Sequence, residues 1–564
     1  MIDLLIKGAT VIDGTGSAAR RADVAVHAGQ ITALGENLGS AHRVIDADGL
    51  LVTPGFVDIH THYDGQATWD AHLTPSCWHG VTSAVFGNCG VGFAPVKPGS
   101  TDFLINLMEG VEDIPGTVLA EGIDWSWESF PEYLNALERK PHSMDIGAQL
   151  PHAALRFFAM GERGADHKEL PSSSELALMQ SLAEQALRAG ALGITTSRTI
   201  KHRARDGRYT PSLSATEPEL FAIANALKRS GRGVLEVNSD FGDGDFEILR
   251  EAARLSGRPM SLLLLQVDNA PELWRKTLRQ IHEARAAGID VTGQVGAKSI
   301  GVLFGFETSR NPFENHPAWS VLAPLSPEQR FARLKADTTL RQRLVAERPV
   351  DPLTNWFSSA FERTFAMGAA LDYEPSAEHS LAQRALRLGI SPWALALDEM
   401  MAADGKAMLL HPFENYFSGD FEVVREMLAD SATVMGLGDA GAHVGLICDG
   451  AGPTYLLKHW ARDRTRGPKL PIEMLVHKQT QATAAVYGLK DRGVLAKGMK
   501  ADINVIDFAA LDLRAPEIAY DLPAGGRRLL QRAKGYRHTF VSGVEVICND
   551  ELTGATPGQL IRSA

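Results

Sequence analysis

Two histidines, His60 and His62, stand two residues apart at the end of the apolar run GFVDIH. Alternate side chains of a β-strand point to the same side, so both imidazoles would face one direction. Two imidazoles at a strand end can hold a divalent metal such as zinc. A bare histidine pair also occurs in solvated loops, so the surrounding chain has to decide between these interpretations.

Short apolar runs followed by helical patterns predict repeated β-α units and a parallel sheet. In the clearest repeat, Ser172 and Glu175 form a capping-box signature, and Gly190 can end the helix before the run LGITTS. Another helix is expected from about Glu217 to a stop at Gly231. We predict an α/β fold, a (β/α)8 TIM-type barrel, whose strands have their carboxyl ends at the chemical face. The candidate strands are GFVDIH, VTSAVFGN, DIGAQLPH, LGITTS, GVLEVN, MSLLLLQ, DVTGQV and TVMGLGD.

The repeat spans residues 54–480, whereas residues 1–53 and 481–564 alternate apolar and polar positions in short strands. These two ends are expected to form one small β-sandwich. Inserts near 100–142 and 300–400 interrupt the barrel and are expected to cover its mouth. Three aromatic-rich stretches of the inserts indicate an apolar lid and a hydrophobic substrate, or else packing or a dimer contact: WSWESFPEYL, NPFENHPAW and NWFSSAFERTF.

Composition excludes several classes of protein. The 564 residues carry a net charge of −12, which disfavours binding to nucleic acid or anionic membranes. Four scattered cysteines form no disulfide framework and favour a reducing compartment. The start MIDLLIKGATVIDG breaks its apolar runs with charges, and no stretch approaches the roughly 18 apolar residues of a membrane span. We expect a cytoplasmic protein with a small-molecule substrate; homo-oligomerisation stays open.

Longer motifs carry a family resemblance. TPGFVDIHTHYD resembles the first barrel strand of the amidohydrolase superfamily, and TQATAAVYGLKDRGVLAKGMKADINVID resembles its last helix and closing β-sandwich. The resemblance therefore spans the whole chain. VTSAVFGNCGVGFAPV is similar to the second-strand motif of the D-aminoacylases, or N-acyl-D-amino-acid deacylases, of amidohydrolase family 3. The resemblance implies a metal-dependent hydrolase with zinc as its cofactor.

The resemblance also implies a set of metal ligands. Cys89 stands where these enzymes use a cysteine in place of a carbamylated lysine, and a thiolate is a strong zinc ligand. Asp439, in VMGLGDAGAH, resembles the eighth-strand aspartate that touches the metal and accepts the proton of the attacking water. The implied metal site is His60, His62, Cys89 and Asp439, with Asp439 catalytic. A small buried thiol and a helix N-cap are the structural alternatives for Cys89 and Asp439.

The chain departs from the family pattern at two strand ends. Asn238 and Gln266 stand where D-aminoacylases place histidines after the fifth and sixth strands. Amide oxygens are poor zinc ligands, so the resemblance predicts one metal rather than two. Rebuilding of a second site by Asp240 or Asp268 is the alternative.

The substrate contacts are less determined. The acidic stretch SDFGDGD stands where the family has a basic residue for the substrate carboxylate. Basic residues after the fourth and seventh strands are candidate replacements, although each could be a solvated charge. Histidines at other strand ends could hold the substrate or orient a ligand. The candidates are His152, Arg198, Lys201, Asn238, Gln266, Lys298, His411 and His443.

The first functional hypothesis is hydrolysis of an amide bond, most of all in an N-acyl amino acid, through a metal-activated water. A cyclic amide, a lactone or an ester would use the same groups, because fold and metal fix the reaction better than the substrate. The second hypothesis is a noncatalytic scaffold that kept the fold. Retention of four metal-binding groups at strand ends favours the enzyme.

Overall fold

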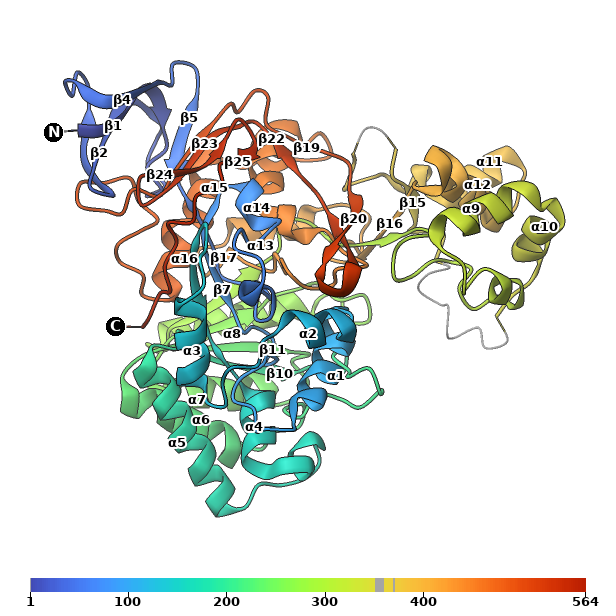
Figure 1. The fold of residues 1–564 in the computed structure, drawn as a ribbon, viewed down its shortest axis with the longest axis horizontal. Helices are drawn as coiled ribbons and strands as arrows, with labels where there is room; N and C mark the ends of the chain where they lie inside the picture. Colours follow the sequence, from blue (N-terminus) through green and yellow to red (C-terminus); the bar gives the residue numbers. More distant parts are fainter. Residues whose placement is uncertain (1, 350–359, 369–370, 564) are drawn as a thin grey trace.

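Strands from both ends of the chain form one sheet in the computed structural model, which describes residues 2–349, 360–368 and 371–563 (Figure 1). β5 (Leu51–Pro54) pairs antiparallel with β18 (Ile503–Ile506). Apolar side chains of both ends, among them Ile6 and Ile503, share one hydrophobic cluster. The remaining strands are β1 (Ile2–Val11), β2 (Arg20–His27), β3 (Gln30–Gly35), β4 (Ala41–Asp46), β23 (Tyr536–Val541), β24 (Val544–Cys548) and β25 (Glu551–Leu552).

Parallel strands occupy every apolar run that the sequence marks as a candidate strand. They form a three-stranded sheet in the order β6-β7-β8 and a six-stranded sheet in the order β17-β13-β12-β11-β10-β9. The run DIGAQLPH supplies both β8 and β9. The bounds are β6 (Phe56–Asp58), β7 (Val81–Phe86), β8 (Asp145–Ala148), β9 (Leu150–Pro151), β10 (Gly193–Arg198), β11 (Val234–Ser239), β12 (Met260–Leu263), β13 (Val291–Val295) and β17 (Thr433–Met435).

Two of the helices that follow these strands begin and end where the sequence predicts. In α5 (Ser173–Ala189), Ser172 and Glu175 make the reciprocal capping box, and Gly190 closes the helix in a left-handed conformation. α6 (Glu217–Ser230) ends at Gly231 in the same way. Further helices of this layer are α4 (His152–Met160), α7 (Asp245–Ser256), α8 (Leu273–Ala286), α13 (Glu422–Ala429), α15 (Ile472–Lys478) and α16 (Gln481–Val486).

The carboxyl ends of β6 and β17 are joined by backbone hydrogen bonds. The His62 amide donates to the Ala440 carbonyl at 2.8 Å, and the Asp439 amide donates to the His60 carbonyl at 3.1 Å. Residues nearly 380 positions apart in the sequence therefore meet at one strand edge. This junction brings the histidine pair next to Asp439.

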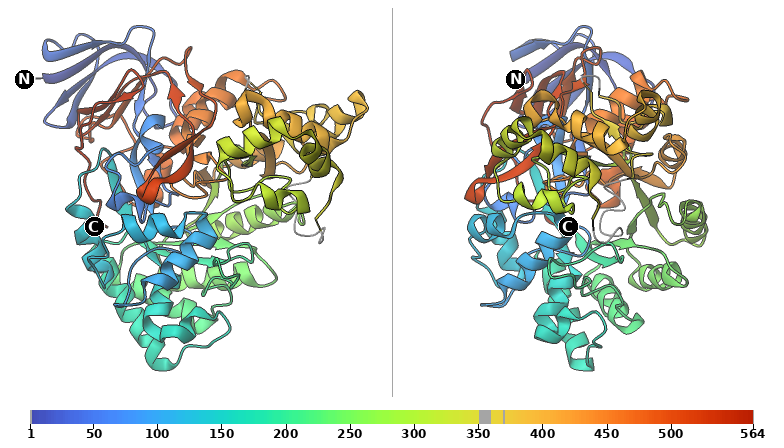
Figure 2. Two further views of the ribbon diagram at one scale, coloured as in Figure 1. Left: turned by 45° about the vertical axis from the view of Figure 1, so that its right-hand side comes forward. Right: turned by 90° about the vertical axis from the view of Figure 1, so that its right-hand side faces the viewer.

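The first insert contributes α1 (Thr101–Glu112), α2 (Gly116–Gly122) and α3 (Phe130–Glu138). The second insert projects from the rest of the molecule as a helical unit, drawn in yellow-green to orange (Figures 1 and 2). It has its own hydrophobic cluster, which includes Phe304, Leu334 and Met400. Its elements are β14 (Ile300–Phe304), α9 (Pro327–Ala336), α10 (Thr338–Ala346), β15 (Phe365–Ala366), α11 (Leu381–Leu388), α12 (Pro392–Gly405) and β16 (Leu409–Glu414).

Apart from the partly exposed Trp125, the described Trp, Phe and Tyr residues of the three aromatic-rich stretches are buried. Trp127 lies against Tyr133 and donates its indole N–H to the Phe93 carbonyl. Phe313 and Trp319 belong to the core of the second insert. Residues 355–359 of NWFSSAFERTF lie outside the described residues. The buried members of these stretches therefore contribute to packing.

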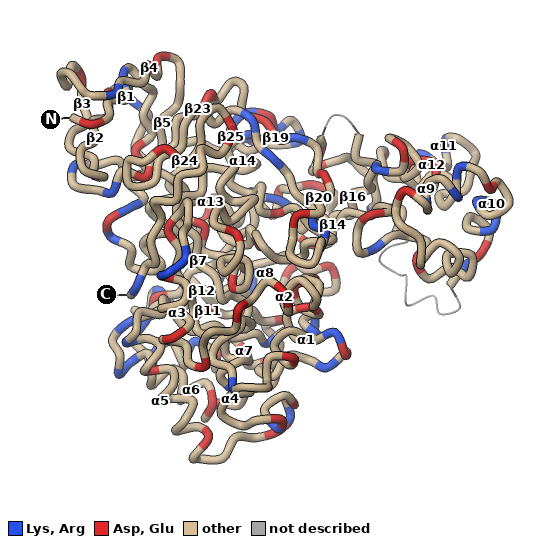
Figure 3. Tube along the Cα trace, viewed as in Figure 1, with Lys and Arg blue, Asp and Glu red and all other residues tan. Residues whose placement is uncertain are grey.

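Lys and Arg residues alternate with Asp and Glu along the trace in Figure 3. Among the described residues, no helix combines the length and the apolar character needed to cross a membrane.

Candidate metal centre

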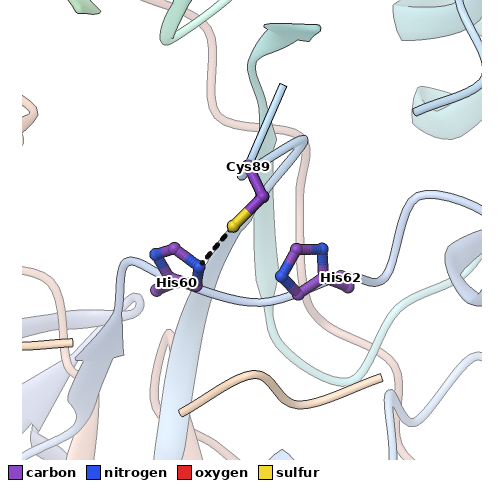
Figure 4. Close-up of side chains that lie close together, drawn as sticks. All are labelled: His60, His62 and Cys89. Carbon is purple, nitrogen blue, oxygen red and sulfur yellow. Dashed lines mark hydrogen bonds between the residues drawn. The ribbon is translucent and has the colours of Figure 1, made fainter. Parts of the chain in front are cut away.

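Three donor side chains converge at the carboxyl ends of β6 and β7 (Figure 4). The metal-binding atoms of His60, His62 and Cys89 lie within 4.8 Å of one another, and all three residues are buried. The Sγ atom of Cys89 lies 3.5 Å from Nε2 of His60. The alternating geometry expected for the two histidines and the turn after β7 thus bring three zinc-type ligands together.

Asp439 completes the cluster from the loop after β17. Its Oδ1 atom lies 3.3 Å from Nε2 of His60 and 3.5 Å from Nε2 of His62. Burial would raise the pKa of Asp439, but the hydrogen bond from His62 and the charges of both histidines hold it below its usual range. The carboxylate is therefore ionised at neutral pH and can bind a cation or accept a proton.

Three of the donor separations match those between ligands around a tetrahedral zinc ion. With Zn–N and Zn–O bonds of about 2.1 Å and a Zn–S bond of about 2.3 Å, neighbouring ligand atoms stand roughly 3.4–3.6 Å apart. Oδ1 of Asp439 lies 3.3 Å from Nε2 of His60 and 3.5 Å from Nε2 of His62, and Sγ of Cys89 lies 3.5 Å from Nε2 of His60, in agreement with these values. The set of two imidazoles, one thiol and one carboxylate is chemically suited to zinc.

Strained backbone holds two of the donors. Cys89 has a φ of 55° and Asp439 a φ of 44°, in the left-handed region that non-glycine residues rarely adopt. Next to Cys89, Gly90 has a φ of 69°, and a Cβ there would lie 2.7 Å from the Ser197 amide nitrogen. Such conformations persist where surrounding packing enforces them, which is typical of functional sites.

The two histidines differ in what surrounds their other ring nitrogen and in their pKa. Nδ1 of His60 is 2.8 Å from Oε1 of Gln294 on β13, which fixes the proton on Nδ1 and leaves Nε2 free. Burial lowers the pKa of His60 to about 4. Burial acts on His62 in the same direction, but the carboxylates of Glu112 and Asp439 outweigh it and raise its pKa to about 9.

A buried acid, Glu236, lies beneath the cluster on β11. Its Oε2 atom accepts the backbone N–H of Cys89 at 3.2 Å, and Oε1 lies 3.9 Å from Nδ1 of His60. Burial raises the pKa of Glu236 to about 8, so the side chain is largely protonated at neutral pH. Sequence reasoning missed Glu236 and Gln294, although a polar residue inside an apolar strand run was a usable signal.

Comparison with known proteins decides the family. The family model described as Amidohydrolase family matches residues 43–547. The chain belongs to the amidohydrolase family. This confirms the resemblance seen in the strand motifs.

Two curated relatives of this amidohydrolase come from Alcaligenes xylosoxydans xylosoxydans. A D-aminoacylase is 28% identical over 579 residues, covering 99% of this chain and 97% of that protein. An N-acyl-D-aspartate deacylase is 26% identical over 568 residues, covering 99% of this chain and 95% of that protein. Both likenesses therefore extend over nearly the full chain.

Solved structures share the fold. An N-acyl-D-glutamate deacylase from Bordetella bronchiseptica, complexed with zinc and a phosphonate inhibitor, superposes with a TM-score of 0.66 at 24% identity. That match covers 100% of this chain and 99% of the other. A D-aminoacylase structure gives 0.65 at 24% identity, with 100% of both chains covered.

The donor side chains His60, His62, Cys89 and Asp439 form what we call the metal cluster of this amidohydrolase. This cluster borders a cavity of about 340 Å³. Both inserts contribute aliphatic walls, with Val111 from α1 and Ile300 and Val302 from β14. His202, which the sequence reasoning did not single out, also lines the cavity, and its Nε2 lies 3.4 Å from Nδ2 of Asn238. The lining is completed by His62, Cys89, Glu112, Thr199, Lys201, Leu263, Leu265, Phe413, Glu414, Leu437, Asp439, His443, Leu446 and Ile447.

Three of the candidate substrate contacts line this cavity: Lys201, Asn238 and His443. Lys201 pairs with Glu414, whose side chain is 5% exposed. The Nδ2 atom of Asn238 lies 3.5 Å from Sγ of Cys89. His443 is partly exposed and lies four residues after Asp439.

The other candidates have partners away from the cavity lining. His152 is buried between Thr196 and Glu219. Arg198 pairs with Asp245. Gln266 bonds through its side chain to the backbone of Phe417 and Pro271. Lys298 forms a buried pair with Asp449, and His411 packs near Phe304 with a hydrogen bond to Thr364.

The two acids considered for a second metal site also have other partners. Asp240 accepts hydrogen bonds from Thr199 and from the Ile200 amide. Asp268 pairs with Arg363. Neither residue is among those lining the cavity.

Proposed function

We propose that this amidohydrolase is a metal-dependent enzyme that cleaves the amide bond of N-acyl amino acids. The observation that carries the proposal is the convergence of His60, His62, Cys89 and Asp439 at zinc-like separations beside a cavity. Curated relatives with nearly full coverage include a D-aminoacylase and N-acyl-D-amino-acid deacylases, which supports the same reaction class.

We infer that the two parallel sheets are parts of one (β/α)8 barrel spanning residues 54–480, with 1–53 and 481–564 forming the accompanying β-sandwich. β8 and β9 follow each other with Gln149 between them, which links the sheets on one side. A bridge between Thr61 and Ala440 links β6 with the strand end of β17 on the other side. Such closure leaves the metal cluster at the carboxyl ends of the strands, as in other barrel enzymes.

The proposal assigns one zinc ion to His60, His62, Cys89 and Asp439. A metal bound there would supply Lewis-acid polarisation of the scissile carbonyl and would lower the pKa of a water. Asn238 and Gln266 offer only amides where a second histidine pair would be needed. We therefore expect one metal per chain.

Asp439 carries the proton transfer in this proposal. Asp439 is ionised, so its carboxylate can accept a proton from water, and Oδ1 lies within 3.5 Å of both histidines. The same group can return the proton to the leaving nitrogen, which must be protonated to depart as an amine. The Asp439 side chain is 11% exposed, so it faces the cavity while remaining shielded from bulk solvent.

The cavity favours an apolar acyl group or side chain. Its walls include Leu263, Leu265, Leu446 and Ile447, whereas Lys201 is already paired with Glu414. We assign Lys201 to binding the substrate carboxylate, which would replace Glu414 as the ion-pair partner of Lys201. Asn238 and His443, which border the metal donors, are assigned to the scissile amide.

The test is elemental analysis of the purified chain combined with hydrolysis of N-acyl-D- and N-acyl-L-amino acids before and after chelation. We expect one zinc per chain and turnover that chelation abolishes and zinc restores. Parallel assays with a cyclic amide, a lactone and an ester define the bond cleaved. Absence of both metal and turnover would replace the proposal with a noncatalytic scaffold.

A further inference from the structure

Glu112 is a carboxylate that the first insert delivers to the metal cluster. It is the last residue of α1 and is 1% exposed. Its Oε1 atom lies 3.4 Å from Nδ1 of His62, and its Oε2 atom lies 3.5 Å from Nε2 of His443. The Glu112 carboxylate therefore lies close to both His62, a donor of the metal cluster, and His443, in the loop after β17.

The two ring nitrogens of His62 face different acids. Nε2 points to Asp439 at 3.5 Å, and Nδ1 points to Glu112. Within the described part of the chain, neither Nδ1 of His62 nor Oε1 of Glu112 has a hydrogen-bond partner, although both atoms are buried. Buried polar atoms of this kind normally find a partner, and these two atoms lie 3.4 Å apart.

The position of Glu112 is unfavourable for the helix itself. A negative charge at a helix C-terminus opposes the helix dipole, and the last turn of α1 contains no basic residue. The end of α1 is nevertheless fixed to the loop after Asp439. The Glu112 carbonyl accepts the His443 amide, and Asp113 accepts the Gly445 amide at 3.1 Å. Packing of the first insert on this loop thus holds the Glu112 carboxylate at the end of α1, although a negative charge is unfavourable there.

We propose that Glu112 is a positioning residue for the metal ligand His62, an inference that rests on the proposed metal-dependent function. The carboxylate accepts the Nδ1 proton of His62, which leaves the Nε2 lone pair directed at the metal. Gln294 does the same for His60 with a neutral amide. Glu112 does so with a carboxylate, which is a stronger hydrogen-bond acceptor than a neutral amide. Through Oε2 it also orients His443 at the cavity wall.

The test compares Glu112→Gln with the parent protein by zinc titration against a competing chelator. We expect the zinc affinity to fall about 10- to 100-fold, which is typical of losing such a carboxylate partner. The control is Glu109→Gln on the same helix, whose carboxylate pairs with Arg205 at 2.9 Å. This control should bind zinc like the parent.

Melting temperatures of the zinc-free proteins separate positioning from folding. Glu112→Gln should melt near the parent, because it keeps the shape of the side chain. If it does not fold, Glu112→Asp, which keeps the charge but withdraws it from both histidines, should still lose affinity several-fold. Parent-like zinc affinity in a folded Glu112 variant overturns the inference. Failure of the parent itself to bind zinc overturns the proposed function instead.

Discussion

The Sγ atom of Cys89 lies 3.5 Å from Nε2 of His60, although the two residues are separated by 29 positions in the chain. Burial raises the pKa of the Cys89 thiol well above its usual value in the metal-free protein. Zinc binding must therefore release a proton from Cys89. Zinc affinity should rise with pH, because deprotonation of the thiol is part of the binding reaction.

Replacement of this thiol should change the metal site in a visible way. In Cys89→Ser, cobalt substituted for zinc should lose the sulfur-to-metal charge-transfer absorption, and zinc affinity should fall at least tenfold. Cys77→Ser, at a buried cysteine outside the donor set, is the control. An unchanged cobalt spectrum in Cys89→Ser would show that the thiol is not a ligand.

Loss of the first histidine should remove the metal. His60→Ala deletes an imidazole that lies 3.5 Å from Sγ of Cys89 and 3.3 Å from Oδ1 of Asp439, so we expect less than a tenth of the parent zinc content and no measurable turnover. Circular dichroism should show a retained fold. His282→Ala, at an exposed position next to Asp430, should behave like the parent. Full activity of His60→Ala would contradict the proposed centre.

Asp439→Asn should separate proton transfer from metal binding. The amide keeps an oxygen toward the histidines but cannot accept a proton, so kcat should fall about 100- to 10,000-fold. Zinc content should fall less than in His60→Ala, because three donors remain. Steady-state kinetics of the zinc-loaded variant measure the fall in kcat, and elemental analysis measures the zinc content. Near-normal kcat would remove Asp439 from the chemical step.

Lys201→Met should affect substrates that carry a carboxylate. We expect KM for an N-acyl amino acid to rise about tenfold, the size of a partly exposed charge-assisted contact. The matching N-acyl amino acid amide, which has no carboxylate, should keep its KM. Equal effects on both substrates would indicate that Lys201 only holds Glu414.

A pH effect on stability is expected from His79, which lies outside the metal cluster. Its ring nitrogens contact Thr454 and the Gln531 carbonyl, both at 2.8 Å, and burial lowers its pKa to about 4. Between about pH 6.5 and 4 the unfolded chain binds a proton that the folded chain does not. Stability is therefore lost as pH falls through this window, by roughly 3 kcal/mol at most.

Thermal melts of zinc-free protein at several pH values measure this contribution. His79→Gln should melt lower than the parent near pH 8, and the difference should shrink toward pH 4. A difference that is constant with pH would mean that His79 does not titrate differently in the two states.

The strands and helix ends were predictable because local signals specify them. The capping box of Ser172 and Glu175 and the glycine stop at Gly190 need only neighbouring residues. His60, His62, Cys89 and Asp439 were identified because each follows an apolar strand in a family motif. Parallel pairing then brings the ends of those strands together.

Contacts that depend on the docking of an insert were not predictable from local sequence. Glu112 ends an amphipathic helix and looks like any helical acid until α1 packs on the loop holding His443. His202 and Lys201 are adjacent, yet only the loop after β10 determines that both line the cavity. Likewise, the candidate contact Gln266 is held by Asn415 and Phe417, which belong to a distant segment.

The pairing of β5 with β18 has a consequence for synthesis on the ribosome. Leu51 pairs with Ile506, so β5 emerges long before its partner. At about 5–20 residues per second, the nascent chain would wait roughly 25–90 s for that strand. Throughout this interval one edge of the amino-terminal strands stays open to other partners. The sheet can thus close around β5 only after β18 has been synthesised, and the amino-terminal strands need protection from other partners until then.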